Sequence, residues 1–143
     1  MAKNISYQLA NLVFALTLSA PIHAATETPF TLNNTVNTYT PEKSQDTKVG
    51  HQFWFIDKQT LDGRTLKMSV VGPGKSTHTA HSHAGDEIFF VLEGKAEFYL
   101  NGSTRIVGPY TSLYSPPNSL HHLRNVGENE LKYLVIKKYK QKN

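Results

Sequence analysis

Apolar and polar positions alternate along most of the chain from residue 51 onward. Short runs rich in β-branched and aromatic residues, such as HQFWFID and EIFFVLEG, are separated by turn-forming Gly, Pro and Asn. No stretch repeats its apolar residues with the period of a helix. The pattern therefore predicts an all-β sandwich or barrel of about eight or nine short strands. We expect strands at residues 51–57, 65–72, 87–94, 95–100, 104–108, 111–115, 120–126 and 131–139.

The first 50 residues differ in composition from the rest of the chain. Residues 1–24 contain Lys3 and then the apolar run LANLVFALTLSA, which is typical of a secretory signal peptide. The run is shorter than the roughly 20 residues that span a bilayer, and the alternative is a buried N-terminal helix. Residues 25–50 are rich in Thr and Asn and predict an arm with at most a short strand near Phe30 or Val36. We therefore expect a periplasmic or secreted protein without stable membrane insertion after signal cleavage.

Composition limits the sources of stability and the kinds of partner. The chain has 143 residues and no cysteine, which excludes disulfides and thiolate metal sites. The net charge is +4, and lysines gather in the closing segment KKYKQKN. We interpret this segment, including residues 140–143, as a frayed basic tail, with a specific anionic partner as the alternative. No basic helix or aromatic-basic sheet motif is present, so the sequence predicts no nucleic-acid partner.

The segment HTAHSHAGDEIFFVLEG concentrates side chains that bind metal ions. His81 and His83 are two residues apart, so in extended backbone they share a face and both can reach one ion. Glu87 opens the next expected strand, and His121 follows the turn SPPNS on a distant strand that a barrel brings alongside. Three imidazoles and one carboxylate suit a divalent Fe, Mn, Ni, Zn or Cu ion and leave positions on it open.

Two segments resemble the two sequence motifs of the cupin superfamily. PGKSTHTAHSHAGDEIFFVLEG resembles the first motif through Gly74, His81, His83, Glu87 and Gly94. The spacing between Gly74 and His81 is one residue longer than usual. SPPNSLHHLRN resembles the second motif through Pro116, His121 and Asn125. Asn118 stands where this motif usually has Gly, and Asn tolerates the left-handed backbone that Gly would supply.

The resemblance covers residues 51–139 and implies a double-stranded β-helix, the jelly-roll barrel of a small single-domain microbial cupin of the type-2 kind. It implies a metal ion inside one open end of the barrel, held by His81, His83, Glu87 and His121. Small barrels of this kind often pair through exposed edge strands, which suggests a homodimer formed through residues 51–57 or 131–139.

The sequence defines the surroundings of the ion less well. Alternation from Glu87 directs Phe89 and Val91 towards the barrel interior. His78 and Tyr99 are the candidates for a catalytic acid or base, and an exposed loop histidine is the alternative for His78. Further polar candidates for the pocket are Lys67, Arg105 and Tyr114, whereas Asp86 and His122 are expected to face away from the ion.

Two functions are compatible with these features. The first is an exported metal-dependent enzyme, a lyase, isomerase or dioxygenase. Its substrate would be a small oxygen-bearing molecule, such as a sugar, uronate or carboxylate, chelated at open metal positions. The second is a non-catalytic module that binds a sugar, a small acid or the metal itself. The fold alone cannot choose between them, because function depends on the pocket.

Overall fold

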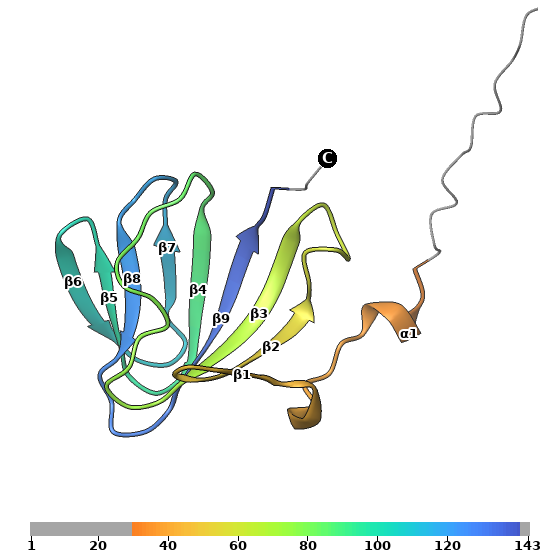
Figure 1. Ribbon diagram of the computed structural model, residues 1–143, viewed down its shortest axis with the longest axis horizontal. Coiled ribbons are helices and arrows are strands. Elements are labelled where there is room, and N and C mark those ends of the chain that lie inside the picture. The colour runs from red at the N-terminus through yellow and green to blue at the C-terminus, as the bar shows by residue number, and fades with distance from the viewer. Residues whose placement is uncertain (1–29, 141–143) are drawn as a thin grey trace, which may run out of the picture. The chain divides into compact units, whose positions relative to one another are not determined.

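The computed structural model describes residues 30–140, and the predicted signal peptide lies outside them. The chain divides into two units, Met1–Thr31 and Leu32–Asn143, and the second contains all the elements labelled in Figure 1. It begins with α1 (Leu32–Thr35) and a 3₁₀ turn, η1 (Pro41–Lys43). Nine strands follow among the described residues: β1 (Gln45–Thr47), β2 (Gly50–Ile56), β3 (Arg64–Val71), β4 (Glu87–Glu93), β5 (Ala96–Leu100), β6 (Ser103–Val107), β7 (Ser112–Ser115), β8 (His121–Asn125) and β9 (Leu131–Lys138).

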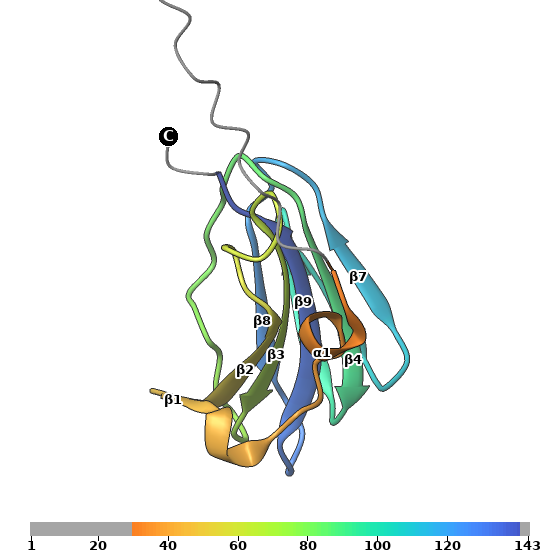
Figure 2. The same cartoon turned by 90° about the vertical axis from the view of Figure 1, so that its right-hand side faces the viewer.

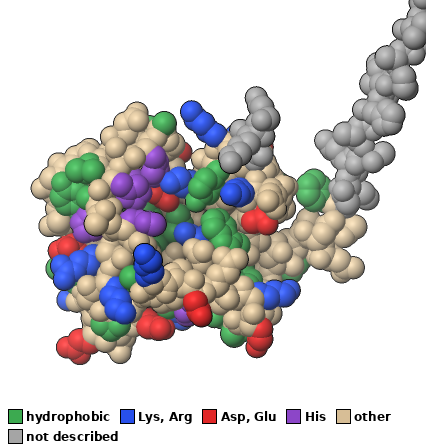
Figure 3. Space-filling model, in the orientation of Figure 1, with side chains coloured by type: hydrophobic (Ala, Val, Ile, Leu, Met, Phe, Trp, Pro, Cys, Tyr) green, Lys and Arg blue, Asp and Glu red, His purple; other side chains and the backbone are tan. Residues whose placement is uncertain are grey.

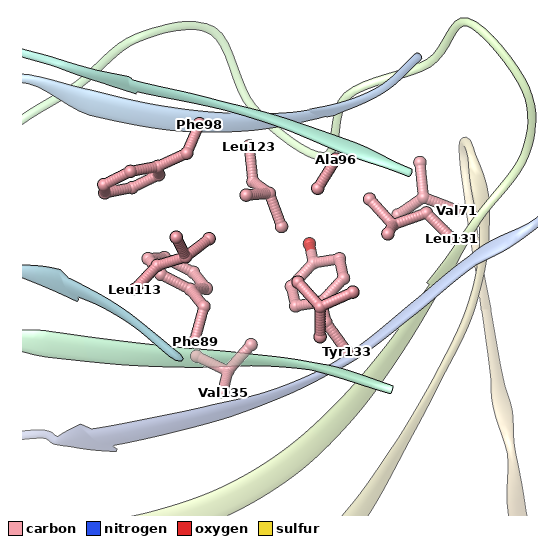
Figure 4. Close-up of a cluster of buried hydrophobic side chains, with 10 residues drawn as sticks. Val71, Phe89, Ala96, Phe98, Leu113, Leu123, Leu131, Tyr133 and Val135 are labelled. Carbon is pink, nitrogen blue, oxygen red and sulfur yellow. The ribbon is translucent and has the colours of Figure 1, made fainter. Parts of the chain in front are cut away.

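The strands form two antiparallel sheets, and the all-β jelly-roll prediction is confirmed. One sheet has six strands in the order β1-β2-β3-β9-β4-β7, and the other has three in the order β6-β5-β8. The core fills the space between them, as Figure 4 shows: Phe98 and Leu123 extend from the small sheet towards Phe89 and Tyr133 on the large one. Within residues 30–140, no helix is long and apolar enough to cross a membrane.

Strand alternation decides which side chains reach this core. In β4, Phe89 and Val91 are 7% and 0% exposed and lie between the sheets, as the sequence predicts. The side chains that point away from the core form a second apolar cluster on the outer face of the large sheet. In this cluster Phe53 of β2 packs with Met68 and Val70 of β3. Both faces of the large sheet therefore carry apolar side chains.

The N-terminal arm is more ordered than the sequence predicts. The sequence predicts at most a short strand near Phe30 or Val36; the structure has α1 and η1 in this arm, followed by β1 further along the chain. Tyr39 packs edge-on against Phe53 with ring centroids 5.2 Å apart, which attaches the arm to the outer cluster. The sheet consequently begins at Gln45, six residues before the expected barrel boundary.

The strand order also corrects one expectation about dimer formation. β9 is hydrogen-bonded to β3 on one side and to β4 on the other, so residues 131–139 cannot provide an open edge. The outer edge of β2 is covered by β1 only along Gly50 to Gln52, so the rest of that edge has no strand partner among the described residues. Of the two strands predicted to form a dimer, only β2 can therefore provide an edge-to-edge contact.

Candidate metal centre

Four predicted ligands meet at the mouth of the space between the sheets. His81 and His83 lie on the connection between β3 and β4, whereas Glu87 opens β4 and His121 opens β8. One ligand atom from each of the four lies within 4.8 Å of all the others. The glutamate belongs to the large sheet and His121 to the small sheet, so the cluster joins the two layers.

The connection between β3 and β4 runs beside β8 (Figures 1 and 2), and backbone hydrogen bonds hold it there. The His81 amide donates to the His121 carbonyl at 3.1 Å, and the His121 amide donates back to the His81 carbonyl at 2.9 Å. The Asn118 amide donates to the His83 carbonyl at 2.8 Å. Asn118 has a φ of 61°, the left-handed conformation expected where the motif usually has Gly.

The three histidines share one arrangement of their ring nitrogens. Each Nδ1 faces a nearby backbone carbonyl: His81 faces Thr79 at 3.1 Å, His83 faces Gly85 at 2.6 Å, and His121 faces Ser119 at 2.8 Å. A carbonyl only accepts hydrogen bonds, so each Nδ1 must carry the proton. In the neutral imidazole, Nε2 is then a bare electron-pair donor, which is the form that binds a metal ion.

These donors converge with the carboxylate of Glu87. Its Oε2 lies 3.1 Å from His83 Nε2 and 3.2 Å from His121 Nε2. Two ligands about 2.1 Å from one ion, at right angles, are about 3 Å apart, so the spacing suits a shared ion. Electron-pair donors this close repel each other unless a proton or a metal ion lies between them. The four side chains therefore fit a divalent transition metal.

Lys137 completes the electrostatics of the cluster. Its Nζ lies 3.6 Å from Glu87 Oε1, and the two side chains are only 17% and 11% exposed. Burial acts to raise the pKa of Glu87, but Lys137 and the hydrogen-bonding imidazoles outweigh it and hold the pKa below its ordinary value. The sequence analysis included Lys137 both in the expected strand at residues 131–139 and in the basic closing segment, and the strand is correct: Lys137 lies in β9, directly opposite Glu87 on β4.

A hollow of about 80 Å³ adjoins the cluster. Lys67 lines it, and burial followed by the nearby charge of Lys137 lowers the pKa of Lys67, against the opposing effect of Glu87. Ser115, the neighbour of Glu87 on β7, is fully buried, and its Oγ has no hydrogen-bonding partner among the described residues. Figure 3 shows the histidine side chains gathered on this face with cationic and hydrophobic side chains beside them.

The two candidates for acid–base catalysis have different positions. His78 lines the hollow with its ring centroid 5.3 Å from that of His81, and desolvation, together with His81 and Lys67, lowers its pKa. Tyr99 points away from the core, because Phe98 on the same strand points inward, and its ring packs against His122 at 5.2 Å. The structure therefore brings His78 to the cluster and does not bring Tyr99 there.

The other polar candidates are also divided. Lys67 lines the hollow, as does Tyr139, which the sequence reading did not single out. Arg105 on β6 is exposed, and Tyr114 on β7 is 52% exposed on the outer face, so neither lines this hollow. Asp86 is exposed, as expected.

Asn125, the last residue matched in the second motif, has a structural position. It is fully buried, and its Nδ2 donates to the carbonyls of Val71 and Asn129, at 2.8 Å each. Its Oδ1 accepts from the Gly127 amide at 2.9 Å. The side chain therefore holds the turn after β8.

Comparisons with known proteins agree with this geometry. The family described as Cupin domain matches residues 67–137. The uncharacterised protein MJ1618 of Methanocaldococcus jannaschii is 28% identical over 71 residues, which cover 50% of this chain and 57% of that protein. The match therefore spans little more than half the length of this curated relative.

Solved structures share the fold. A Cupin 2 conserved barrel domain protein from Salinispora arenicola has a TM-score of 0.60 at 21% identity, covering 73% of this chain and 87% of that one. A predicted oxalate decarboxylase from Thermotoga maritima has a TM-score of 0.58 at 21% identity, covering 62% and 78%. KdgF from Halomonas sp. has a TM-score of 0.58 at 19% identity, covering 68% and 88%. At these identities the likeness establishes the fold alone.

Proposed function

The chain belongs to the cupin superfamily, and we propose that it is an exported metal-dependent enzyme. Its substrate would be a small oxygen-bearing molecule, such as a sugar, a uronate or a carboxylate. The observation that carries the proposal is the convergence of three Nε2 atoms and the Glu87 carboxylate beside an accessible hollow. The reaction would be that of a lyase, an isomerase or a dioxygenase.

A bound ion would polarise a carbonyl, carboxylate or diol oxygen of the substrate as a Lewis acid. The residues around the ion would orient its ligands and transfer protons. The carbonyls behind His81, His83 and His121 keep each Nε2 directed at the ion. Lys137 holds Glu87 ionised and oriented through Oε1. His78, whose lowered pKa favours the neutral ring at pH 7, can accept a substrate proton on a ring nitrogen.

One observation supports the alternative, a non-catalytic binding module. Among the described residues that line the hollow, Glu87 is the only carboxylate, and it is engaged as a ligand. Proton transfer would then depend on His78, His122, the lysines or a tyrosine hydroxyl. A module that binds a sugar, a small acid or the metal needs none of these transfers.

The first test measures metal content. Purified protein is stripped with a chelator, reloaded with Fe(II), Mn(II), Ni(II) or Zn(II), and analysed for bound metal. We expect one ion per chain in the wild type, and none when His81→Ala is combined with His83→Ala. The matched control is His51→Ala with His122→Ala, which removes two histidines outside the cluster and should keep the metal. Full metal content in the first double variant would show that these ligands are wrong.

The second test distinguishes the enzyme from the module. Each metal form is incubated with uronates, keto-sugars, oxalate and catechols, and both turnover and binding are measured. Turnover that is lost in His78→Gln at retained metal content supports the enzyme and the role given to His78. Binding without turnover for every metal favours the module.

Export and dimer formation are part of the same proposal. The pattern of residues 1–24 supports export, and mass spectrometry of the mature protein should show their loss. Ile88, Ile136 and Tyr114 support a dimer, because they are 36%, 39% and 52% exposed at adjacent positions on the outer face of β4, β9 and β7. Analytical ultracentrifugation should show a dimer that Ile136→Glu dissociates, and a monomeric wild type at micromolar concentration would contradict it.

A further inference from the structure

The hollow at the metal cluster is too small to hold a whole ligand. Its volume is about 80 Å³, whereas ligand pockets typically measure about 300–1,000 Å³. Two further hollows adjoin it. One, of about 230 Å³, shares Lys67 and His78 with it, and the other, of about 750 Å³, shares Tyr139. A molecule bound at the cluster can therefore extend into these neighbouring hollows.

The inner face of the large sheet connects these hollows. Glu87 on β4 pairs with Lys137 on β9, and Lys67 on β3 pairs with Trp54 on β2. All four side chains face the same side of the sheet by alternation, and β3 is the neighbour of β9. Each step crosses one strand, so the path from Glu87 to Trp54 is about 15 Å long at about 4.8 Å per strand.

The first part of this path is positively charged. Lys67 and Lys137 both line the hollow at the cluster. Lys137 contacts Glu87, but among the described residues no carboxylate lies within ion-pair distance of Lys67. The Lys67 Nζ instead lies 5.2 Å from the centre of the Trp54 ring. A partly buried ammonium without an anionic partner favours a ligand that brings the anion.

The far part of the path is rich in amides and aromatic rings. The hollow of about 750 Å³ is lined by five residues with side-chain amides, by three aromatic residues and by the charged residues Lys43, Asp57 and Lys58. The amide residues are Asn33, Asn37, Gln45, Gln52 and Gln59, and the aromatic residues are Phe53, Trp54 and Tyr139. A side-chain amide both donates and accepts hydrogen bonds, as a hydroxyl group requires of its partner. Ring faces provide apolar surface for the C–H groups between hydroxyls. This lining suits a polyhydroxylated ligand better than an apolar one.

We propose that the substrate is an extended, polyhydroxylated carboxylate. Its carboxylate lies beside Lys67 and Lys137 with its chelating oxygens at the metal centre, and its remaining sugar-like part crosses Trp54 into the amide-lined hollow. This assignment of substrate class rests on the proposed function, and it adds a second binding region about three strands away from the ion.

Calorimetric titration with three probes tests the proposal on metal-loaded and chelator-treated full chain. Trigalacturonate is extended and anionic, galacturonate is anionic but short, and maltotriose is extended but uncharged. We expect trigalacturonate to bind at least about tenfold more tightly than either of the others, since only it occupies both regions. Equal affinity for trigalacturonate and galacturonate overturns the extended site, and equal affinity for trigalacturonate and maltotriose overturns the anionic one.

Variants separate the two regions. Lys67→Met should weaken both acidic probes by about tenfold and leave maltotriose unchanged. Trp54→Ala and, independently, Gln52→Ala should weaken trigalacturonate several-fold and leave galacturonate unchanged. Lys132→Met and Tyr110→Ala are the matched controls, because Lys132 pairs with Glu93 and Tyr110 is 84% exposed and lines none of the three hollows. A Lys67→Met protein that folds and binds all three probes like the wild type overturns the anionic subsite.

Metal content distinguishes the failure of this proposal from the failure of the proposed function. A protein that holds one ion and binds oxalate but does not prefer trigalacturonate keeps its metal centre and overturns the extended site. A protein that holds no ion but shows the expected probe and variant pattern keeps the binding groove, while the metal-dependent function is contradicted.

Discussion

Replacing Lys137 by Met tests the electrostatic reasoning at the centre of the site. Met has a similar length and keeps the buried part of the side chain, but it removes the ammonium 3.6 Å from Glu87 Oε1. Glu87 is buried in both proteins, so the substitution leaves a carboxylate that has lost its closest cation. We expect the metal-free variant to be less stable at pH 7, with its Glu87 pKa raised.

The magnitude follows from the geometry of the pair. At the effective dielectric constant of about 20 that describes such sites, two unit charges about 4 Å apart attract by about 4 kcal/mol. Removing one partner from a buried pair costs about 3–5 kcal/mol. Because the imidazoles of His83 and His121 remain beside Oε2, we expect a loss of about 2–3 kcal/mol in the free energy of unfolding.

The loss should depend on pH. The folded-state pKa of Glu87 lies below its ordinary value of 4.5. The stability that its ionisation contributes is therefore present above pH 4.5 and is lost as the pH falls through the folded-state pKa. In the Lys137→Met variant this contribution is reduced or reversed in sign. The difference between the two proteins should be largest near pH 7 and should shrink once the carboxylate is protonated.

Urea unfolding in the presence of a chelator, at several pH values between 7 and 4, measures this difference. Lys138→Met is the matched control, because it removes the same charge from the neighbouring residue, whose partner Asp62 is exposed. We expect a smaller loss there, since solvent screens the pair. Equal losses for the two variants, or a Lys137→Met loss that does not change from pH 7 to pH 4, would refute the reasoning.

Three further predictions concern the scaffold and the ion. Asn125→Ala removes three buried hydrogen bonds and should lower the free energy of unfolding by about 2–4 kcal/mol, measured by urea titration. Gly94→Ala should lower the free energy of unfolding more than Gly102→Ala in the same assay. Both glycines have positive φ, but a Cβ at Gly94 would lie 2.5 Å from the Glu130 carbonyl oxygen, whereas a Cβ at Gly102 would have no atom within 4 Å. Metal at about 100 times its dissociation constant should stabilise the wild type by about 2.7 kcal/mol in thermal unfolding, and His121→Ala should abolish this gain.

The strands could be predicted because their apolar residues alternate or form short runs. β9 carries apolar residues on both of its faces. Leu131 and Val135 face the core, whereas Leu134 packs on the outer cluster and Ile136 faces outward. Such a continuous run is typical of a strand covered on both faces, and it is consistent with the central place of β9. β1 could not be predicted, because its three residues are all exposed and its pairing with β2 depends on the turn between them.

The metal ligands could be proposed from their residue types and spacing, but their neighbours required the fold. Lys137 lies in the strand predicted at residues 131–139, but it was also counted with the basic tail because it belongs to a lysine-rich segment, and its place beside Glu87 was not predicted. Lys137 is separated from Leu131, Tyr133 and Val135 by even numbers of positions, so in a strand it faces inward with them. The outward position of Tyr99 could have been predicted, because Ala96, Phe98 and Leu100 on one face of β5 alternate with Glu97 and Tyr99 on the other.

The two oxygens of Glu87 have different partners, and this explains why a lysine lies next to a metal ligand. Oε1 faces Lys137, whereas Oε2 faces the Nε2 atoms of His83 and His121. The imidazoles cannot rotate their Nε2 atoms away without losing the contacts of Nδ1 with backbone carbonyls, so the Nε2 atoms stay directed at the same point as Oε2. Lys137 favours the ionised carboxylate and occupies one oxygen, which leaves the other directed at the imidazoles. The arrangement therefore favours a carboxylate that stays ionised and binds the ion through one oxygen.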